Sequence, residues 1–394
     1  MNAAETADQE ASATNHHHKK RNVWLFAILV IFVFVGLGWF FFWFFLGRFY
    51  ENTDDCYVHG NQVYITPQVA GSVTAIFVED TDLIREGQLI ATLDTTNYEM
   101  TLFEDKAQLA MTVRNVAALF EAVREKKATV AYRKAELIQR ELDLSHREGL
   151  INSGAISVEE FEDAQTNVLT ASAALALAEA ELESANVLVQ GTTVYTHPDV
   201  LKRAAMVRES FINLERCAIR APVTGYVGKR SVQVGKEVAA GEQLMVVIPL
   251  YDLWAEANFR ETKIGNIRIG QKVTIWADIY GRDIKYYGTV VGFSPGTGDA
   301  FALLPPQNAS GNWIKIIQRL PIRVSLSKKE LEKNPLMLGL SLHASVDIRE
   351  TDGDMLSPVP VDGYPIYQTE IFDWTWSFLQ INQAIDQIIL DNIL

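Results

Sequence analysis

The sequence predicts an α+β protein in which a small β-domain is divided by a long antiparallel coiled-coil hairpin. A transmembrane helix precedes this domain, and a small β-barrel follows it. Three observations predict this arrangement. An uncharged apolar run lies near the N-terminus, a glycine-containing β-motif occurs twice, and apolar residues recur every seven positions between its two copies.

Composition excludes several classes of function without selecting one. The 394 residues include 35 Lys and Arg against 49 Asp and Glu, a net charge of −14. Nucleic-acid binding is not expected, because such proteins need clustered positive charge to displace counterions. Two cysteines are too few for a disulfide scaffold or a four-thiolate metal site.

The first predicted element is a membrane-spanning helix over residues 23–47. This run of 25 residues contains no charge, and an α-helix needs roughly 20 residues to cross a bilayer. A cleaved signal peptide is not expected, because the run is too long and ends in WFFLG without a small-residue cleavage site. Cys56 follows two aspartates, which is unlike a lipoprotein site. We therefore expect an uncleaved anchor that contacts membrane lipid.

Charges beside this run predict its orientation. Basic residues precede it and acidic residues follow it: Lys19, Lys20 and Arg21 on one side, and Glu51, Asp54 and Asp55 after Arg48 on the other. Positive residues stay on the cytoplasmic side, so the N-terminus is predicted inside and the chain beyond residue 50 outside. We expect residues 1–22 to be a disordered tail, with His16 to His18 incidental rather than metal ligands.

The repeated β-motif occupies residues 69–94 and 223–248, at a constant offset of 154 (223 − 69). The matching positions are Val69 and Val223, Gly71 and Gly225, Val73 and Val227, Val78 and Val232, Ile84 and Val238, and Gly87 and Gly241. Each copy alternates in the manner of short strands with glycine turns. A copy this short cannot bury a core alone. The two copies are therefore predicted to pair with each other.

The intervening chain is predicted to form two long helices. Apolar residues lie at positions 102, 109, 116, 123, 130, 137, 144 and 151. After Asn152-Ser153-Gly154, a second seam alternates spacings of three and four at 161, 164, 168, 171, 175, 178, 182, 185 and 189. This is the pattern of a coiled coil. The returning arm is expected to break near residues 191–193 and 197–198 and to resume to about Arg216.

The remainder is predicted to be a small barrel and a terminal helix. Short alternating strands are expected at 271–276, 288–293, 320–326 and 345–348, with an early strand from 57–66. Phe378, Ile381, Ile385, Ile388 and Ile389 share one face of a helix over residues 376–394. Such an apolar face needs a covering surface.

Together these features resemble the periplasmic adaptor, or membrane fusion, proteins of the HlyD family. The residues that carry the resemblance are TDDCYV at 53–58 with Gly60 and Asn61, the half-repeat around Gly71, APVTGYV at 221–227, NFRET at 258–262, GDAFALLPPQNASGNWIK at 298–315 and QRLP at 318–321. They extend over nearly the whole chain beyond residue 20.

The resemblance implies that the split β-domain is lipoyl-like, with turn glycines at Gly71, Gly87, Gly225 and Gly241. The implied organisation is a cytoplasmic tail at 1–22, a transmembrane helix at 23–47, a membrane-proximal segment and first barrel strand at 48–66, lipoyl-like halves at 67–96 and 217–250, a helical hairpin at 97–216 with its tip at about 146–157, a β-barrel at 251–350 and a C-terminal segment at 351–394.

The resemblance also implies a function and its partners. The chain would link an inner-membrane transporter of the major facilitator type to a TolC-like outer-membrane channel, as a homo-oligomer of three or six copies that exports hydrophobic drugs. The family's tip motif places Arg, Leu and Ser at fixed spacings. Here Leu150 and Ser157 are in register, but His146 occupies the arginine position and Arg147 lies one residue later.

Other functions remain open at this stage. An adaptor for an ABC-type protein or peptide exporter and a non-transport envelope tether fit the same architecture. A lipoyl or biotin carrier is disfavoured, because the segment after the first half-repeat, Asp94 to Asn97, lacks the lysine that holds the cofactor. No cofactor, metal or catalytic group is expected. A disulfide between Cys56 and Cys217 is not expected either, because the two are far apart in sequence and a bridge needs a close approach.

Overall fold

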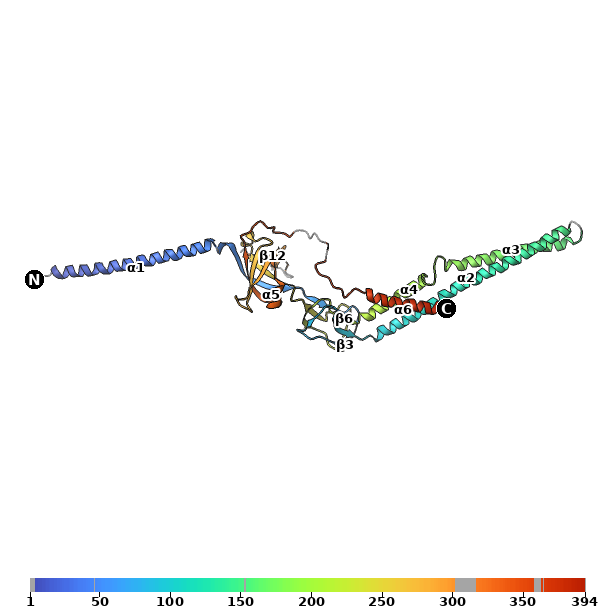
Figure 1. The fold of residues 1–394 in the computed structure, drawn as a ribbon, viewed down its shortest axis with the longest axis horizontal. Helices are drawn as coiled ribbons and strands as arrows, with labels where there is room; N and C mark the ends of the chain where they lie inside the picture. Colours follow the sequence, from blue (N-terminus) through green and yellow to red (C-terminus); the bar gives the residue numbers. More distant parts are fainter. Residues whose placement is uncertain are drawn as a thin grey trace, which may run out of the picture. The chain divides into compact units, whose positions relative to one another are not determined.

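The computed structural model describes residues 4–45, 47–151, 154–301, 317–357, 363 and 365–393. They form two compact units. One contains Met1–Val63 and Val247–Tyr367, and the other contains Tyr64–Val246 and Gln368–Leu394. The predicted fold class is confirmed, with an apolar N-terminal helix, a closed barrel, and a split β-domain interrupted by a helical hairpin (Figure 1).

The N-terminal helix, α1, extends over Ala4–Phe45 and is followed by a short 3-10 turn, Gly47–Phe49. Within the described residues, one stretch is long and apolar enough to cross a membrane, Trp24–Phe49. The expectation of a disordered tail was wrong, since the helix begins at Ala4. Its first three turns are rich in alanine and glutamate, which have high helix propensity, and the apolar run extends the same helix.

The first unit is a closed antiparallel barrel with the strand order β1-β10-β13-β12-β11-β14. Inward positions alternate with outward ones along each strand, as in β10, where every second residue is buried. The strands are Tyr50–Gly60 (β1), Leu253–Arg260 (β10), Arg319–Ser325 (β13), Tyr286–Phe293 (β12), Lys272–Ala277 (β11) and Ser341–Asp347 (β14). Short helical turns, Ile264–Asn266 (η2), Gly298–Phe301 (η3) and Lys328–Lys333 (α5), lie in the connections.

The segment 57–66 differs from the single barrel strand that was expected. The barrel strand starts earlier, at Tyr50, and ends at Gly60, whereas Val63–Ile65 forms β2 of the split β-domain. A Cβ atom at Gly60 would press on Cδ2 of Leu253, so a larger residue at the end of the strand would require the Leu253 side chain to shift. The break falls at Gly60-Asn61, a pair of residues typical of turns.

The split β-domain consists of two four-stranded sheets with the orders β2-β9-β7-β4 and β6-β5-β3-β8. Each sheet takes strands from both halves of the repeat, which confirms that the two copies pair. The strands are Gly71–Ile76 (β3), Leu83–Ile84 (β4) and Leu89–Leu93 (β5) from the first half, and Ala218–Arg220 (β6), Gly225–Arg230 (β7), Glu237–Val238 (β8) and Met245–Ile248 (β9) from the second.

Backbone hydrogen bonds make the two halves nearly equivalent. The Gly87 N–H donates to the carbonyl of Ala221 at 2.8 Å, and the Gly241 N–H donates to the carbonyl of Pro67 at 2.9 Å. Gly241 is the repeat equivalent of Gly87, and Ala221 is the repeat equivalent of Pro67. The two bonds are therefore equivalent, except that the donor lies in the first half in one and in the second half in the other. Both glycines have positive φ, 78° and 82°, a conformation that explains why glycine recurs there.

One position breaks this equivalence. Thr81 adopts a φ of 77° where the second half has Gly235 at 83°, and both N–H groups make the same interhalf bond, to Val227 and Val73. A β-branched residue is strained at positive φ. We expect Thr81→Gly to stabilise the split β-domain by up to about 1 kcal/mol and Gly235→Thr to destabilise it by a similar amount. Denaturant unfolding of both variants tests this, and a loss of stability in Thr81→Gly would contradict it.

The hairpin consists of α2 (Thr96–Ile151) and a returning arm divided into α3 (Val158–Val187) and α4 (Pro198–Glu215). Every residue of the second predicted seam is buried or half-buried, whereas most of its neighbours on α3 are exposed. Lys126 of α2 and Glu181 of α3 form an ion pair across the helices at 2.7 Å. The coiled-coil prediction is therefore confirmed, including the break before His197, whose ring accepts a bond from the Asp199 N–H at the start of α4.

The C-terminal helix, α6 (Thr375–Ile393), supplies a third helix at the root of the hairpin (Figure 1). Its face of Ile381, Ile385 and Ile389 is 2–3% exposed and packs against α2 and α4. Two side-chain hydrogen bonds flank this core, from Arg114 to Asn392 and from Arg208 to Asn382. The predicted amphipathic face is thus covered by the chain's own hairpin.

Candidate functional site: the hairpin tip

The tip is the region where the two coils end and the chain reverses. Helix α2 ends at Ile151, and the predicted turn residues Asn152 and Ser153 lie outside the described residues. Gly154 has a φ of 72°, a left-handed conformation that favours glycine at this reversal. The backbone N–H groups of Gly154 and Ala155 donate to the last carbonyls of α2. The turn is therefore closed by ordinary helix-ending bonds.

Ser157 begins the returning helix as its N-cap. Its hydroxyl accepts a bond from the Glu160 N–H at 3.2 Å, and the Glu160 carboxylate accepts one from the Ser157 N–H at 2.9 Å. This reciprocal pair is a capping box. Ser157 therefore caps the returning helix. The hydroxyl is exposed but already engaged within the chain.

The capping box predicts a pH dependence at the tip. The hydrogen bonds from Ser157 lower the pKa of Glu160 below its usual value of 4.5. A lowered carboxyl pKa stabilises the folded form above the unfolded pKa, and this contribution is lost as the pH falls through the folded pKa. We expect the protection factors of the amides in the first turn of α3 to fall below about pH 4.5. Glu160→Gln should remove this dependence, and an unchanged acid response in that variant would contradict the assignment.

Arg147 joins the two arms of the tip. Its Nη1 donates to the Glu160 carbonyl at 2.9 Å, and its Nη2 lies 3.4 Å from the Asp143 carboxylate. Arg147 therefore joins α2 to the first turn of α3 and stabilises the hairpin end. His146, which occupies the family's arginine position, is exposed beside it.

The apolar surface of the tip is larger than the sequence indicated. Leu150 is 46% exposed, as expected of a docking residue, and Val158, immediately after the cap, is 65% exposed. The predicted seam begins at Phe161 and therefore does not include Val158. Its position could have been found as the first helical residue after a Ser-x-x-Glu cap, outside the seam. The tip thus presents two apolar side chains between engaged polar groups.

The four predicted turn glycines lie at the opposite end of the hairpin, in the split β-domain. Gly87 and Gly241 occupy left-handed turns, whereas Gly71 and Gly225 begin strands β3 and β7. A Cβ atom added at Gly71 would lie 3.4 Å from the Cβ of Leu93. With 56 residues, α2 separates them from the tip by roughly 80 Å. The predicted site residues therefore form two separate groups. The glycines shape the backbone of the split β-domain, and the remaining residues lie at the hairpin tip.

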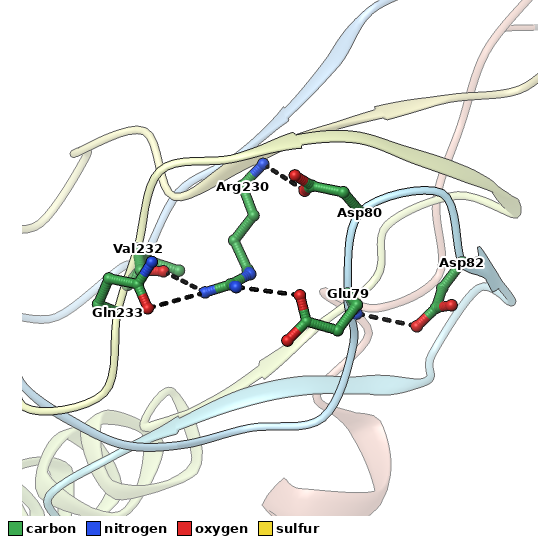
Figure 2. A network of polar contacts seen from close by, with 6 residues as sticks. All are labelled: Glu79, Asp80, Asp82, Arg230, Val232 and Gln233. Carbon is green, nitrogen blue, oxygen red and sulfur yellow. Dashed lines mark hydrogen bonds and ion pairs between the residues drawn. The ribbon is translucent and has the colours of Figure 1, made fainter.

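A polar network fixes the root turns to each other (Figure 2). Nη2 of Arg230 lies 3.0 Å from the Glu79 carboxylate, and its Nη1 donates to the carbonyl of Val232 at 2.7 Å. The Arg230 N–H donates to Asp80 at 2.8 Å, so one residue joins the end of β7 to the turn after β3. The Arg230 side chain is only 15% exposed, whereas Glu79 is 76% exposed. The network therefore joins the first half of the split β-domain to the second.

The two cysteines are free and lie in different units. Cys56 is buried in the barrel, where burial raises the pKa of its thiol to about 12. Cys217 is buried in the second unit, and burial raises the pKa of its thiol to about 11. Both are therefore protonated at neutral pH and behave as apolar core residues.

Comparisons with known proteins agree with this architecture. The family described as "EMRA, alpha-helical hairpin domain" matches residues 96–217. The multidrug export protein EmrA of Escherichia coli (strain K12) is 40% identical over 351 residues, 89% of each chain. The fatty acid resistance protein FarA of Neisseria gonorrhoeae is 40% identical over 339 residues, 86% of this chain and 84% of that one.

Among solved structures, the periplasmic adaptor protein EmrA matches with a TM-score of 0.38 at 19% identity, over 76% of this chain and 99% of that one. The assignment rests on the sequence relatives, which cover more than four-fifths of both chains. With its apolar N-terminal helix, split β-domain, hairpin and barrel, this chain belongs to the EmrA-type family of membrane fusion proteins.

Proposed function

We propose that the chain is the periplasmic adaptor subunit of a tripartite efflux pump. The helix around Trp24–Phe49 anchors it in the inner membrane with the N-terminus in the cytoplasm. The barrel and split β-domain lie in the periplasm, where they meet a proton-driven transporter of the major facilitator type. The hairpin tip docks on a TolC-like outer-membrane channel, and hydrophobic drugs or toxic compounds leave through the assembly. The adaptor itself aligns its partners and catalyses no reaction.

The observation that carries the proposal is the hairpin with its exposed apolar tip. Two helices held by a buried seam form a long spacer, and the three-helix root holds it at the β-domain. A spacer of this length has no evident use in a chain that acts alone. Leu150 and Val158 are exposed where any partner beyond the hairpin must be met. Two relatives, a multidrug export protein and a fatty acid resistance protein, support export as the process.

Assembly into a ring of three or six copies is part of the proposal. One hairpin cannot enclose a path for an exported compound, and its outer faces expose apolar side chains to solvent. These include Ile138 and Leu142 on α2, and Leu169 and Leu177 on α3, which are 49–68% exposed. Lateral packing of neighbouring copies would cover them, and cyclic symmetry closes such a set of interfaces.

A deletion strain tests the proposal against its alternatives. Loss of the chain is expected to raise susceptibility to a panel of hydrophobic compounds, with restoration by the intact gene. Unchanged susceptibility with altered envelope integrity would overturn efflux in favour of a structural tether. The inner-membrane protein that copurifies should lack a nucleotide-binding domain, because its presence would indicate an ABC-type exporter and contradict the proton-driven partner.

A further inference from the structure

Charged residues of α2 are absent from the part of the helix where they are normally found. The side of each hairpin helix that faces away from its buried seam is here called the outer edge. In a two-helix coil the outer edge meets only water, so its residues are usually polar or charged. From position 126 to position 143 of α2, every charged residue lies in the seam or beside it. These eight residues are Lys126, Lys127, Arg133, Lys134, Glu136, Arg140, Glu141 and Asp143.

Both outer edges contain an uncharged, largely apolar band. The α2 band consists of Ala128, Ala131, Tyr132, Ala135, Ile138, Gln139 and Leu142. The α3 band consists of Thr166, Leu169, Thr170, Ala173, Ala176, Leu177 and Ala180. All of these residues are exposed. The large side chains among them are 49–68% exposed, namely Tyr132, Ile138, Leu142, Leu169 and Leu177. A single hairpin therefore leaves two apolar strips in water.

Two contacts within the hairpin fix the relative heights of the bands. Lys126 pairs with Glu181 at 2.7 Å, and Arg147 donates to the Glu160 carbonyl at 2.9 Å. The residue numbers of each pair add to 307, and a constant sum is what antiparallel helices of equal rise give. Residues of α2 and α3 whose numbers add to about 307 therefore lie at the same height. The α2 band at 128–142 and the α3 band at 166–180 thus coincide in height to within one residue.

Cyclic symmetry brings equal heights together. Copies in a closed ring are related by rotation alone, so a residue keeps its height from one copy to the next. When α2 of one copy lies beside α3 of its neighbour, residues whose numbers add to about 307 meet. Ile138 then meets Leu169, since each directly follows a seam position and both lie on the same face of the hairpin. On the other face, Tyr132 meets Leu177.

The charges that bound the bands are complementary in the same register. At the root end Arg124 meets Glu183, and at the tip end His146 meets Asp163. All four residues are exposed. Arg124 pairs with Glu121 of its own helix at 2.5 Å, but its side chain remains 80% exposed and can reach a neighbour.

The other acidic residues near Arg124 meet no acidic partner. Glu121 lies at the height of Val187, and Glu125 lies at the height of Ser184. Along both edges, apolar residues therefore oppose apolar ones and charges oppose charges of the other sign or uncharged residues. This agreement over about 20 Å favours a second copy of the chain as the partner of each band.

We propose that neighbouring copies contact each other head to tail through these bands, with α2 of each copy against α3 of the next. The contact rests on the proposed ring and specifies it further, since it fixes which edges meet and in which register. Each edge is used once per copy, as a closed ring requires. The tip and the root of the hairpin remain free for other partners.

Paired cysteines at Ala135 and Ala173 test the contact. Both residues lie opposite a seam, and their numbers add to 308. Within one chain they face away from each other across two helices, so a disulfide can form only between copies. In membranes of cells that produce the full-length chain, a mild oxidant is expected to convert Ala135→Cys/Ala173→Cys into a ladder of multimers that collapses on reduction. The native Cys56 and Cys217 are buried and stay in place.

The matched control moves one cysteine along the same edge. Ala135→Cys/Ala180→Cys shifts the second position by one heptad, about 10 Å, which is beyond the reach of a disulfide. This variant should give no ladder. Chains with a single cysteine each, Ala135→Cys and Ala173→Cys, should give dimers and nothing larger when they are produced together.

Two further changes in the ladder-forming variant test the chemistry of the contact. Leu169→Glu should lower the yield of multimers at least about tenfold, because a carboxylate would lose water against Ile138. Glu183→Arg should lower the yield several-fold by placing like charges together, and Arg124→Glu in the same chain should restore it.

Contrary results are distinct from failure of the ring itself. The absence of multimers from Ala135→Cys/Ala173→Cys would overturn the contact, as would an equal ladder from the shifted pair. Dimers from Ala135→Cys alone would overturn the head-to-tail order, because like edges would then meet. Mass measurement in mild detergent separates the two proposals. Rings without the matched crosslink contradict this contact alone, whereas monomers alone contradict both the contact and the ring.

Discussion

A chain carrying Leu150→Asp is expected to be produced and folded normally and yet to give no more drug resistance than a deletion strain. Leu150 is 46% exposed at the tip, so a carboxylate there remains hydrated in the free chain. On a docked channel, the same carboxylate would have to lose water without a partner, at a cost of about 3 kcal/mol or more. This corresponds to at least roughly a hundredfold loss of affinity.

The matched control for this prediction is Leu201→Asp. Leu201 is 50% exposed on α4, on the same hairpin but near its root. It should retain full resistance, as measured by the minimum inhibitory concentration of an exported compound with protein level checked by immunoblot. Full resistance in Leu150→Asp at normal protein level would show that the tip does not dock through this residue. Loss of the protein itself would instead make Leu150 a structural residue.

The second large effect is expected at the root, where Ile385→Ala should loosen the packing of α6 on α2 and α4. Ile385 is 2% exposed in the core shared by the three helices. Removing most of its side chain leaves a cavity that costs about 2–5 kcal/mol. Hydrogen exchange of α2 residues 102–116 and of α6 reports this loss directly.

Leu390→Ala on the outer face of α6 is the control for that change. Leu390 is 53% exposed, and surface substitutions away from special features change stability by about 0.5 kcal/mol or less. Unaltered exchange in Ile385→Ala would contradict the view that α6 stabilises the hairpin root. Equal acceleration in both variants would show that the buried face of α6 contributes no more to its stability than the outer face does.

Much of this fold is predictable because it repeats. Apolar residues recur every seven positions on α2, and small and large residues alternate along the seam of α3. Antiparallel packing of the two helices is the arrangement that buries both seams. The duplicated motif predicts interhalf pairing for a similar reason, since neither half can close a core. Gly87 and Gly241, at matching positions, are required by left-handed turns that the structure contains.

Features that depend on contacts distant in sequence were not predictable. The amphipathic face of α6 was evident, but its periodicity does not say which surface covers it. That surface is formed by α2 and α4, more than 150 residues away in the sequence. Gly60 and Asn61 mark the break between β1 and β2, but a turn signal does not say which sheet each strand joins. The bond from Arg147 to the Glu160 carbonyl depends in the same way on how the two arms meet at the tip.

Photo-crosslinking in living cells tests the adaptor function most directly. A benzophenone amino acid placed at position 150 would lie on the exposed tip, and the same group at position 201 serves as the root control. The proposed function predicts a crosslink from position 150 to an outer-membrane channel protein, and none from position 201. Crosslinks from position 150 to inner-membrane proteins alone, with the protein at its normal level, would contradict a spacer that reaches the outer membrane.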